Sequence, residues 1–219
     1  MSERITILDF VDKYAAKYAG DTFLREKLNG VWQETSFENT RKEGRVLAAA
    51  FMSLGLQKGE RVALISEGRK LWIIAELGVL YAGGTDVPLS AKLEESNDLL
   101  FRINHSDSRF VIASQQQLPK IRKIIGQLPM VEKIIVLDDL AEYGEKEIGI
   151  TEFTKMGEAY IAEHEDKLIE RSKSVGPDDY ANISYTSGTT SDPKGVILTH
   201  RNYTANVEQG SSVISVDRG

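Results

Sequence analysis

The sequence has no cysteine, few histidines and no excess of basic residues, and each shortage excludes a class of protein. Without cysteine, the 219 residues form no disulfide, no cysteine-ligated zinc site and no thiol nucleophile. Absence of cysteine is typical of a reducing compartment, so the predicted location is cytoplasmic. The three histidines, His105, His164 and His200, stand far apart and lack the close spacing of a histidine metal site.

Positive charge is also scarce. The chain has 27 Lys and Arg against 33 Asp and Glu, a formal net charge of −6, and an isoelectric point near 5.3. A dedicated nucleic-acid binder normally carries a basic excess, so no nucleic-acid partner is expected. With 41% hydrophobic and 27% charged residues, the composition is that of an ordinary globular protein.

Long apolar runs are missing too. The longest, residues 71–84, is interrupted by Glu76 and falls short of the roughly 20 residues that a membrane-spanning helix needs. The first 20 residues carry Glu3, Asp9 and Asp12 and have no unbroken apolar stretch, which excludes a signal peptide. The sequence therefore predicts no transmembrane segment and leaves peripheral membrane contact open.

What is present is an alternation of helical and strand-like segments. Asn29-Gly30 separates two strand-like runs, residues 22–28 and 31–35, which predicts an N-terminal β-hairpin because both turn positions favour positive φ. A capping box of Thr35 and Glu38 predicts the start of a helix that runs to about residue 54. Further helices are expected over residues 5–18, 70–81, 94–104, 118–126 and 152–169, and strands over 62–65, 85–88, 110–113, 133–137, 180–185 and 196–199.

The short strands are apolar at nearly every position, as in a parallel sheet covered on both faces. The predicted fold is α/β, a mostly parallel sheet flanked by helices with an N-terminal β-hairpin. Residues 1–171 are expected to form an N-terminal α/β subdomain. Residues 172–219 would hold a linker, a ligand-binding loop and the following strand and helix. The acidic stretch 138–147 is interpreted as a solvated loop.

One segment has the composition of a phosphate-binding loop. Between two apolar strands lie residues 186–195, Thr-Ser-Gly-Thr-Thr-Ser-Asp-Pro-Lys-Gly, with five hydroxyls, two glycines and one lysine. Glycine lets the backbone approach a ligand, successive N–H groups can converge on an anion, and Lys194 adds a compact positive charge. Composition alone also permits a solvated Ser/Thr/Gly-rich surface loop without function.

Two common nucleotide-binding patterns are absent. Pro193 stands where a Walker A motif requires glycine before the lysine, so a P-loop NTPase is excluded. No Gly-x-Gly-x-x-Gly occurs, which removes the usual dinucleotide fingerprint.

The ordered stretch Tyr185-Thr-Ser-Gly-Thr-Thr-Ser-Asp-Pro-Lys-Gly-Val196 resembles the signature of the adenylate-forming superfamily, which includes acyl-CoA synthetases, adenylation domains and luciferases. Ser191 is the one departure, because the family usually has glycine there. Residues 65–72, 81–89 and 198–202 are similar to the long-chain fatty acyl-CoA synthetase branch in particular. The resemblance implies that the chain is an N-terminal fragment, part of the large N-terminal domain of an acyl-adenylate-forming enzyme.

The same resemblance implies a two-step activity. A carboxylate attacks ATP to give acyl-AMP and pyrophosphate, and the thiol of CoA then displaces AMP. ATP and Mg²⁺ are the implied cofactors, CoA is the co-substrate, and a fatty acid is the expected small-molecule partner. The residues expected to bind the ATP phosphates are Thr186, Ser187, Gly188, Thr189, Thr190, Lys194 and Gly195, and Thr186 is also expected to contact Mg²⁺.

Two alternatives remain at this stage. The first is adenylation of another carboxylate, such as an aromatic acid or an amino acid. The second is a stand-alone nucleotide-binding module. Family members carry an acidic metal ligand, a ribose-binding Asp and a catalytic lysine further along the chain, and none has a match here. The catalytic residues are therefore expected C-terminal to this segment, and the parent protein is expected to be an acid–thiol ligase.

The first prediction is that the 219-residue chain alone has no measurable acyl-CoA ligase activity. Each missing electrostatic group typically contributes a factor of about 10²–10³ in rate. Pyrophosphate release from ATP with Mg²⁺ and a panel of fatty acids measures it. Turnover at a rate ordinary for enzymes would contradict the fragment interpretation.

Overall fold

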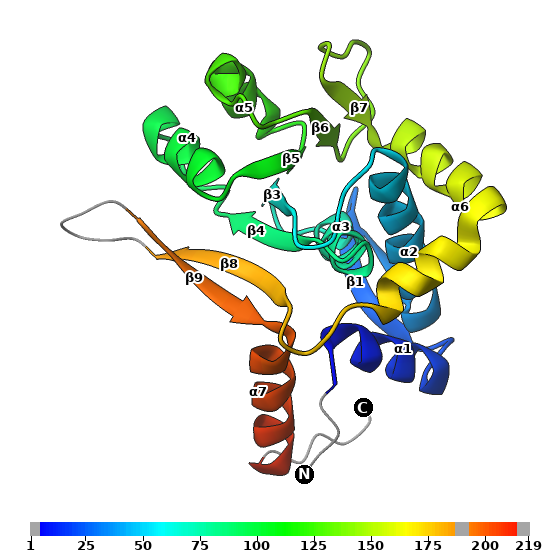
Figure 1. Ribbon diagram of the computed structural model, residues 1–219. Coiled ribbons are helices and arrows are strands. Elements are labelled where there is room, and N and C mark those ends of the chain that lie inside the picture. Colours follow the sequence, from blue (N-terminus) through cyan, green and yellow to red (C-terminus); the bar gives the residue numbers. More distant parts are fainter. Residues whose placement is uncertain (1–4, 187–192, 214–219) are drawn as a thin grey trace.

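The structure, a computed structural model, describes residues 5–186 and 193–213 and is built around one mostly parallel sheet (Figure 1). In spatial order, the described strands of this sheet are β7 (Glu147–Gly149), β6 (Lys133–Val136), β5 (Ser108–Ala113), β3 (Arg61–Ile65), β4 (Thr85–Leu89), β8 (Tyr180–Thr186) and β9 (Lys194–Thr199). All neighbouring pairs are parallel except β8 and β9, which are antiparallel. The predicted α/β class is confirmed.

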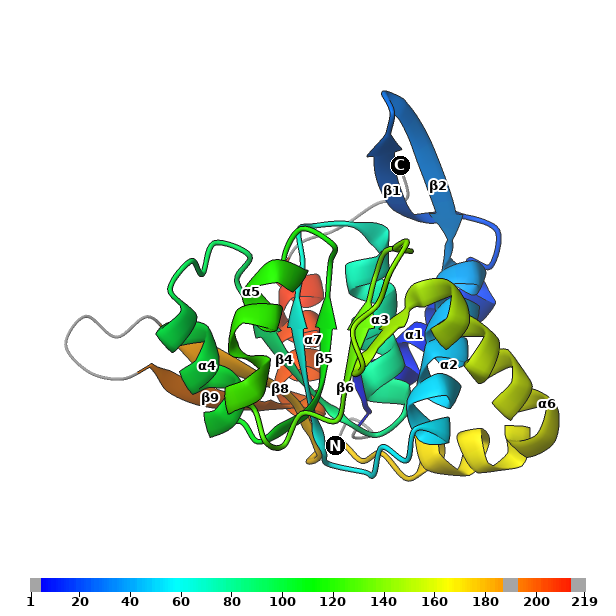
Figure 2. The same ribbon diagram turned by 90° about the horizontal axis from the view of Figure 1, so that it is seen from above.

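Helices cover both faces of the sheet (Figure 2). The side chains of β3 alternate between these two faces: Val62 and Leu64 pack on one, and Ala63 and Ile65 pack on the other, as expected for a strand buried on both sides. Each face is covered by its own group of helices. The first group comprises α1 (Ile7–Lys17), α2 (Phe37–Ser53), α3 (Lys70–Tyr81) and α6 (Ile150–Lys173), and the second comprises α4 (Ser96–His105) and α5 (Leu118–Ile124), which a short 3₁₀ turn, Ile125–Gln127, extends. Within the described ranges, none of the helices is both long and apolar enough to span a bilayer.

The predicted N-terminal hairpin is present. Strands β1 (Thr22–Leu28) and β2 (Val31–Ser36) pair antiparallel and extend away from the main sheet (Figure 2). At the turn, Asn29 has φ 50° and Gly30 has φ 82°. Both angles are positive, as the Asn-Gly turn requires.

The structure differs from the sequence-based expectations at three places. The N-cap of α2 is Ser36, whose side chain accepts from the amide of Asn39 at 3.2 Å, because Thr35 is buried within β2. The end of the acidic stretch adds an unpredicted strand, β7, beside β6. Helix α6 extends to Lys173, past the predicted end at residue 169, with a kink at His164. The division of the chain at residue 172 stays a prediction.

Helix α2 is packed so closely between α3 and α6 that glycine is required at the contacts. A Cβ placed on Gly78 of α3 would lie 2.8 Å from Cβ of Leu47, and one on Gly44 of α2 would lie 3.0 Å from Cβ of Leu77. On α6, a Cβ at Gly157 would lie 2.0 Å from the carbonyl oxygen of Val46. The three helices therefore form a layer whose spacing depends on these glycines.

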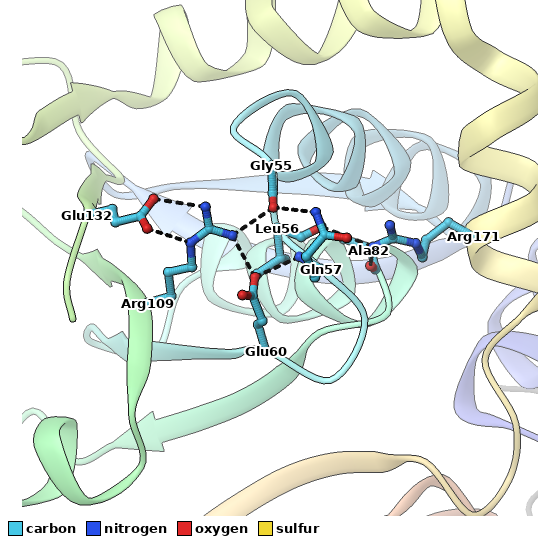
Figure 3. A network of polar contacts seen from close by, with 8 residues as sticks. All are labelled: Gly55, Leu56, Gln57, Glu60, Ala82, Arg109, Glu132 and Arg171. Atoms are coloured by element: carbon cyan, nitrogen blue, oxygen red, sulfur yellow. Dashed lines mark hydrogen bonds and ion pairs between the residues drawn. The ribbon is translucent and has the colours of Figure 1, made fainter.

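Two arginines fix the loop between α2 and β3 (Figure 3). Arg109 of β5 donates to the carbonyl of Gly55 and to Glu60, both at 2.7 Å, and also pairs with Glu132. Arg171, in the last turn of α6, donates to the carbonyls of Leu56 at 3.0 Å and Ala82 at 3.1 Å. The end of α6 is thereby held against the segments that precede β3 and β4.

The contact at Gly157 makes a stability prediction. Gly157→Ala forces a methyl group against the Val46 carbonyl, and overpacking of this kind costs about 1–3 kcal/mol, occasionally more. Alanine's better helix propensity offsets at most ~1 kcal/mol of that loss. Urea unfolding should show the lower stability. Gly126→Ala, where an added Cβ meets nothing within 4 Å, is the matched control; equal stability of the two variants would contradict the packing argument.

Candidate phosphate-binding site

The predicted phosphate loop joins β8 and β9, and the structure describes its two ends. In the antiparallel pair, Thr186 lies opposite Lys194 and Tyr185 lies opposite Gly195. The predicted site residues Thr186, Lys194 and Gly195 are therefore brought together. Ser187, Gly188, Thr189 and Thr190 lie outside the described residues.

Thr186 and Lys194 offer a hydroxyl and an ammonium group on one face of the hairpin. Directly opposed residues of an antiparallel pair project their side chains to the same side. Both side chains are exposed, and among the described residues no carboxylate pairs with Lys194. A free cation beside a hydroxyl donor can meet a phosphate oxygen without first breaking an internal ion pair.

Gly195 and Tyr185 lie on the other face. A Cβ on Gly195 would lie 3.0 Å from Cγ2 of Ile183 and 3.5 Å from the Tyr185 ring, so glycine allows these side chains to close over the strand. Glycine is needed here because the side chains of Ile183 and Tyr185 approach the strand closely. Backbone conformation is not the reason, since Gly195 has an ordinary strand conformation.

Tyr185 anchors the hairpin to α4. Its hydroxyl lies 2.8 Å from Nδ1 of His105, and its ring lies 5.4 Å from the guanidinium carbon of Arg102. Burial raises the pKa of Tyr185, so the phenol stays neutral. The sequence leaves the role of His105 open and gives no indication that Arg102 contacts the hairpin. Their helical spacing, three residues apart, puts them on one face of α4, but nothing local indicates which strand that face meets.

The base of the hairpin is attached to β4 at few points. Asp86 of β4 and Asn182 of β8 form the single bridge between the two strands, and the hydroxyl of Thr85 donates to the carbonyl of Tyr180 at 3.1 Å. Beyond Asn182 the hairpin leaves β4 and runs beside α4 (Figures 1 and 2). Its outer part is therefore positioned mainly by Tyr185.

After β9 the chain enters α7 (His200–Val213), which packs against α1. Thr199 and Asn202 cap this helix reciprocally: the Asn202 side chain accepts from the Thr199 amide at 2.8 Å, and Thr199 Oγ1 accepts from the Asn202 amide at 3.3 Å. His200 is buried, its Nδ1 accepts from the Ile7 amide at 3.3 Å, and burial lowers its pKa to about 4. His200 is thus a neutral side chain that ties α7 to α1.

The third histidine, His164, also makes structural contacts. His164 stands at the kink of α6, with φ −142° and ψ 34°. Its ring packs edge-on against Tyr160 at 5.0 Å between centroids.

The described residues offer few groups for a metal. No cluster of three or more His, Asp or Glu side chains in this part of the chain could hold an ion. Mg²⁺ bound with nucleotides takes most of its ligands from phosphates and water and only one or two from protein. The exposed hydroxyl of Thr186 is compatible with one such ligand.

This hairpin lies within the region that matches a known protein family. The family described as AMP-binding enzyme matches residues 11–218. The chain belongs to the AMP-binding enzyme family. The expected membership of the adenylate-forming superfamily is thereby confirmed.

Related AMP-binding enzymes include CoA ligases. A long-chain-fatty-acid–CoA ligase of Xenopus laevis is 29% identical over 201 residues, which cover 91% of this chain and 27% of that protein. A crotonobetaine/carnitine–CoA ligase of Salmonella agona is 30% identical over 201 residues, covering 87% of this chain and 36% of that protein. The chain therefore spans about a quarter to a third of the length of these relatives.

Solved structures of the family share the fold. A long-chain-fatty-acid–CoA ligase from Archaeoglobus fulgidus superposes with a TM-score of 0.76 at 20% identity, over 97% of this chain and 40% of that one. An anthranilate–CoA ligase solved with anthranoyl-AMP superposes with a TM-score of 0.78 at 21% identity, over 95% of this chain and 37% of that one. At these identities the likeness concerns the fold.

The Tyr185 anchor makes the third prediction. Tyr185→Phe keeps the ring but removes its hydrogen bond to His105, which should lower the free energy of unfolding by about 0.5–1.5 kcal/mol. A double-mutant cycle with His105→Asn, followed by urea unfolding, isolates the pair. We expect a coupling energy of at least about 0.5 kcal/mol. Strictly additive losses would show that the two side chains do not act together.

Proposed function

We propose that this chain supplies the phosphate-binding part of an ATP-dependent fatty acid–CoA ligase. The reaction joins a fatty acid carboxylate to AMP with release of pyrophosphate, and CoA then displaces AMP to give acyl-CoA. The observation that carries the proposal is the pairing of Thr186 with Lys194 at the stem of the family's signature loop. The proposal includes a cytoplasmic location, in keeping with the absence of cysteine.

The role of the hairpin in this reaction is electrostatic. Charge develops on the β- and γ-phosphates as pyrophosphate leaves, and positioned donors that meet this charge accelerate phosphorus chemistry without taking part covalently. Lys194 supplies the positive charge, and Thr186 supplies a neutral donor on the same face. Glycines 188 and 195 belong to the proposed site with Ser187, Thr189 and Thr190.

Mg²⁺ would neutralise part of the phosphate charge when bound, with the hydroxyl of Thr186 as a protein ligand. The protein's own contribution is to hold Thr186 and Lys194 in register. That register depends on the strand pairing and on the contact of Tyr185 with His105.

A long-chain fatty acid is the proposed acyl substrate, because the relatives of this chain include long-chain-fatty-acid–CoA ligases from animals and a fatty acyl-CoA synthetase of Dictyostelium discoideum. A substrate panel for the intact ligase should include carnitine, crotonobetaine and anthranilate as competitors. Preference for one of these would replace the fatty acid in the proposal.

Lys194→Ala in the intact ligase gives the fourth prediction. Loss of a charge-assisted hydrogen bond is worth roughly 1.5–3 kcal/mol, which corresponds to about a 10- to 150-fold loss in kcat/KM for adenylate formation. CoA attack on supplied acyl-AMP involves no pyrophosphate, so this half-reaction should be largely unchanged. Pyrophosphate release and acyl-CoA formation from acyl-AMP are measured side by side.

Lys123→Ala is the matched control, because Lys123 is an exposed lysine on α5. It should leave both half-reactions unchanged. Equal losses in both half-reactions for Lys194→Ala would mean that Lys194 supports the fold or the adenylate, and no loss in either would mean that it is a solvated lysine.

A further inference from the structure

An apolar groove lies between α1 and α7. Helix α7 follows the end of β9 that is remote from Lys194. The groove encloses about 420 Å³ and is lined by aromatic and aliphatic side chains, with one charged residue, Glu76. Its aromatic lining comes from several elements, with Phe10 on α1, Phe23 on β1, Phe37 on α2 and Tyr203 on α7. We call it the α1–α7 groove.

A buried carboxyl group, that of Asp86, lies on the face of the sheet that carries α1 and α3, because its strand neighbour Val87 packs on the α4–α5 face. Asp86 of β4 is completely buried, and neither of its side-chain oxygens has a hydrogen-bond partner in the described structure. Burial and the neighbouring Glu76 raise the pKa of Asp86 well above its ordinary value. Burial also raises the pKa of Glu76, to about 7.

Tyr203 lines the groove together with Glu76. Burial and the charges of Glu76 and Asp86 raise the pKa of Tyr203. Within the described part of the chain, no lysine or arginine pairs with either acid. A carboxyl group buried without a partner is costly, and a cation brought to it removes much of that cost.

The rim of the groove is apolar as well. Phe23 on β1 is 45% exposed and Val207 on α7 is 55% exposed. An apolar rim around an uncompensated acid is complementary to a basic side chain flanked by apolar ones.

We propose that the α1–α7 groove binds a polypeptide segment that inserts a lysine or arginine side chain, between apolar side chains, toward Glu76 and Asp86. The segment comes from the part of the ligase that this chain does not span. The origin of the segment rests on the proposed function, whereas the selection of a cation rests on the groove alone.

Two observations favour a segment of the same protein over other occupants. The relatives are about three to four times longer than the region matched here, so a long polypeptide is available to cover the groove. The groove is lined by α1 and α7, which are far apart in the sequence, together with β1, α2 and α3, and an apolar surface of this kind is normally buried in a complete domain.

The fifth prediction uses a matched pair of probes on the 219-residue chain, n-hexylguanidinium and the neutral n-hexylurea. The guanidinium should bind at least tenfold more tightly, measured by NMR titration of α1 and α7 resonances. Glu76→Gln should abolish that preference. Glu152→Gln, which alters an exposed acid on α6, should retain it. Equal binding of the two probes to the wild-type chain, or no binding of either, would overturn the proposal without relying on any variant.

The intact ligase identifies the occupant. Because the segment fills the groove there, n-hexylguanidinium should no longer bind at this site. Binding retained in the intact ligase would assign the groove to a free small cation instead. A dimer of the 219-residue chain that n-hexylguanidinium dissociates, seen by sedimentation, would assign it to a second copy. These titrations contain neither nucleotide nor CoA. Failure of the intact ligase in the pyrophosphate assay would therefore contradict the proposed function without changing the result of the probe titration on the 219-residue chain.

Discussion

The close approach of α2 to α3 and α6 determines how the rest of the structure is arranged. At Gly78 and Gly157 a side chain would collide with the neighbouring helix, at Gly157 with its backbone, and at Gly44 it would make a tight contact with Leu77. Since α3 connects β3 to β4, fixing α3 against α2 also fixes the two central strands. The end of α6 is held by Arg171 to the segments before those strands, so β8 starts from a defined position.

The phosphate hairpin depends on this frame through two attachments of different kinds. At its base, one bridge and one hydroxyl contact join β8 to β4. Further out, Tyr185 contacts His105 and Arg102 of α4, a helix on the other face of the sheet from α2. The orientation of Thr186 and Lys194 therefore follows from contacts made by their neighbours. A hairpin with one backbone bridge to the neighbouring strand needs such a side-chain anchor to keep its orientation.

The sequence was informative where a local cause decides the structure. Apolar strands alternating with helices predicted the parallel sheet because both sheet faces are covered, and Asn29-Gly30 predicted the hairpin because its angles are positive. The sequence was not informative where a contact with a residue far away in the chain determines the local structure. Strand β7 is short, and Glu147 within it is held by Arg122, which is 25 residues away. The contact of Tyr185 with His105 spans 80 residues and leaves no periodic signal. The signature named candidate site residues, but it carried no information on the contacts that hold Thr186 and Lys194 in place.

The acid pair and the phosphate hairpin meet at the same residue. Asp86 forms the backbone bridge to Asn182 that starts the hairpin, and its side chain is the buried carboxyl group on the face of the sheet that carries α1 and α3. A cation that compensates Asp86 therefore stabilises the strand on which the hairpin is based. Since α7 lines the groove and also follows β9 directly, a segment that fills the groove fixes both strands of the hairpin at once. On this proposal, the segment that covers the apolar surface also positions Lys194.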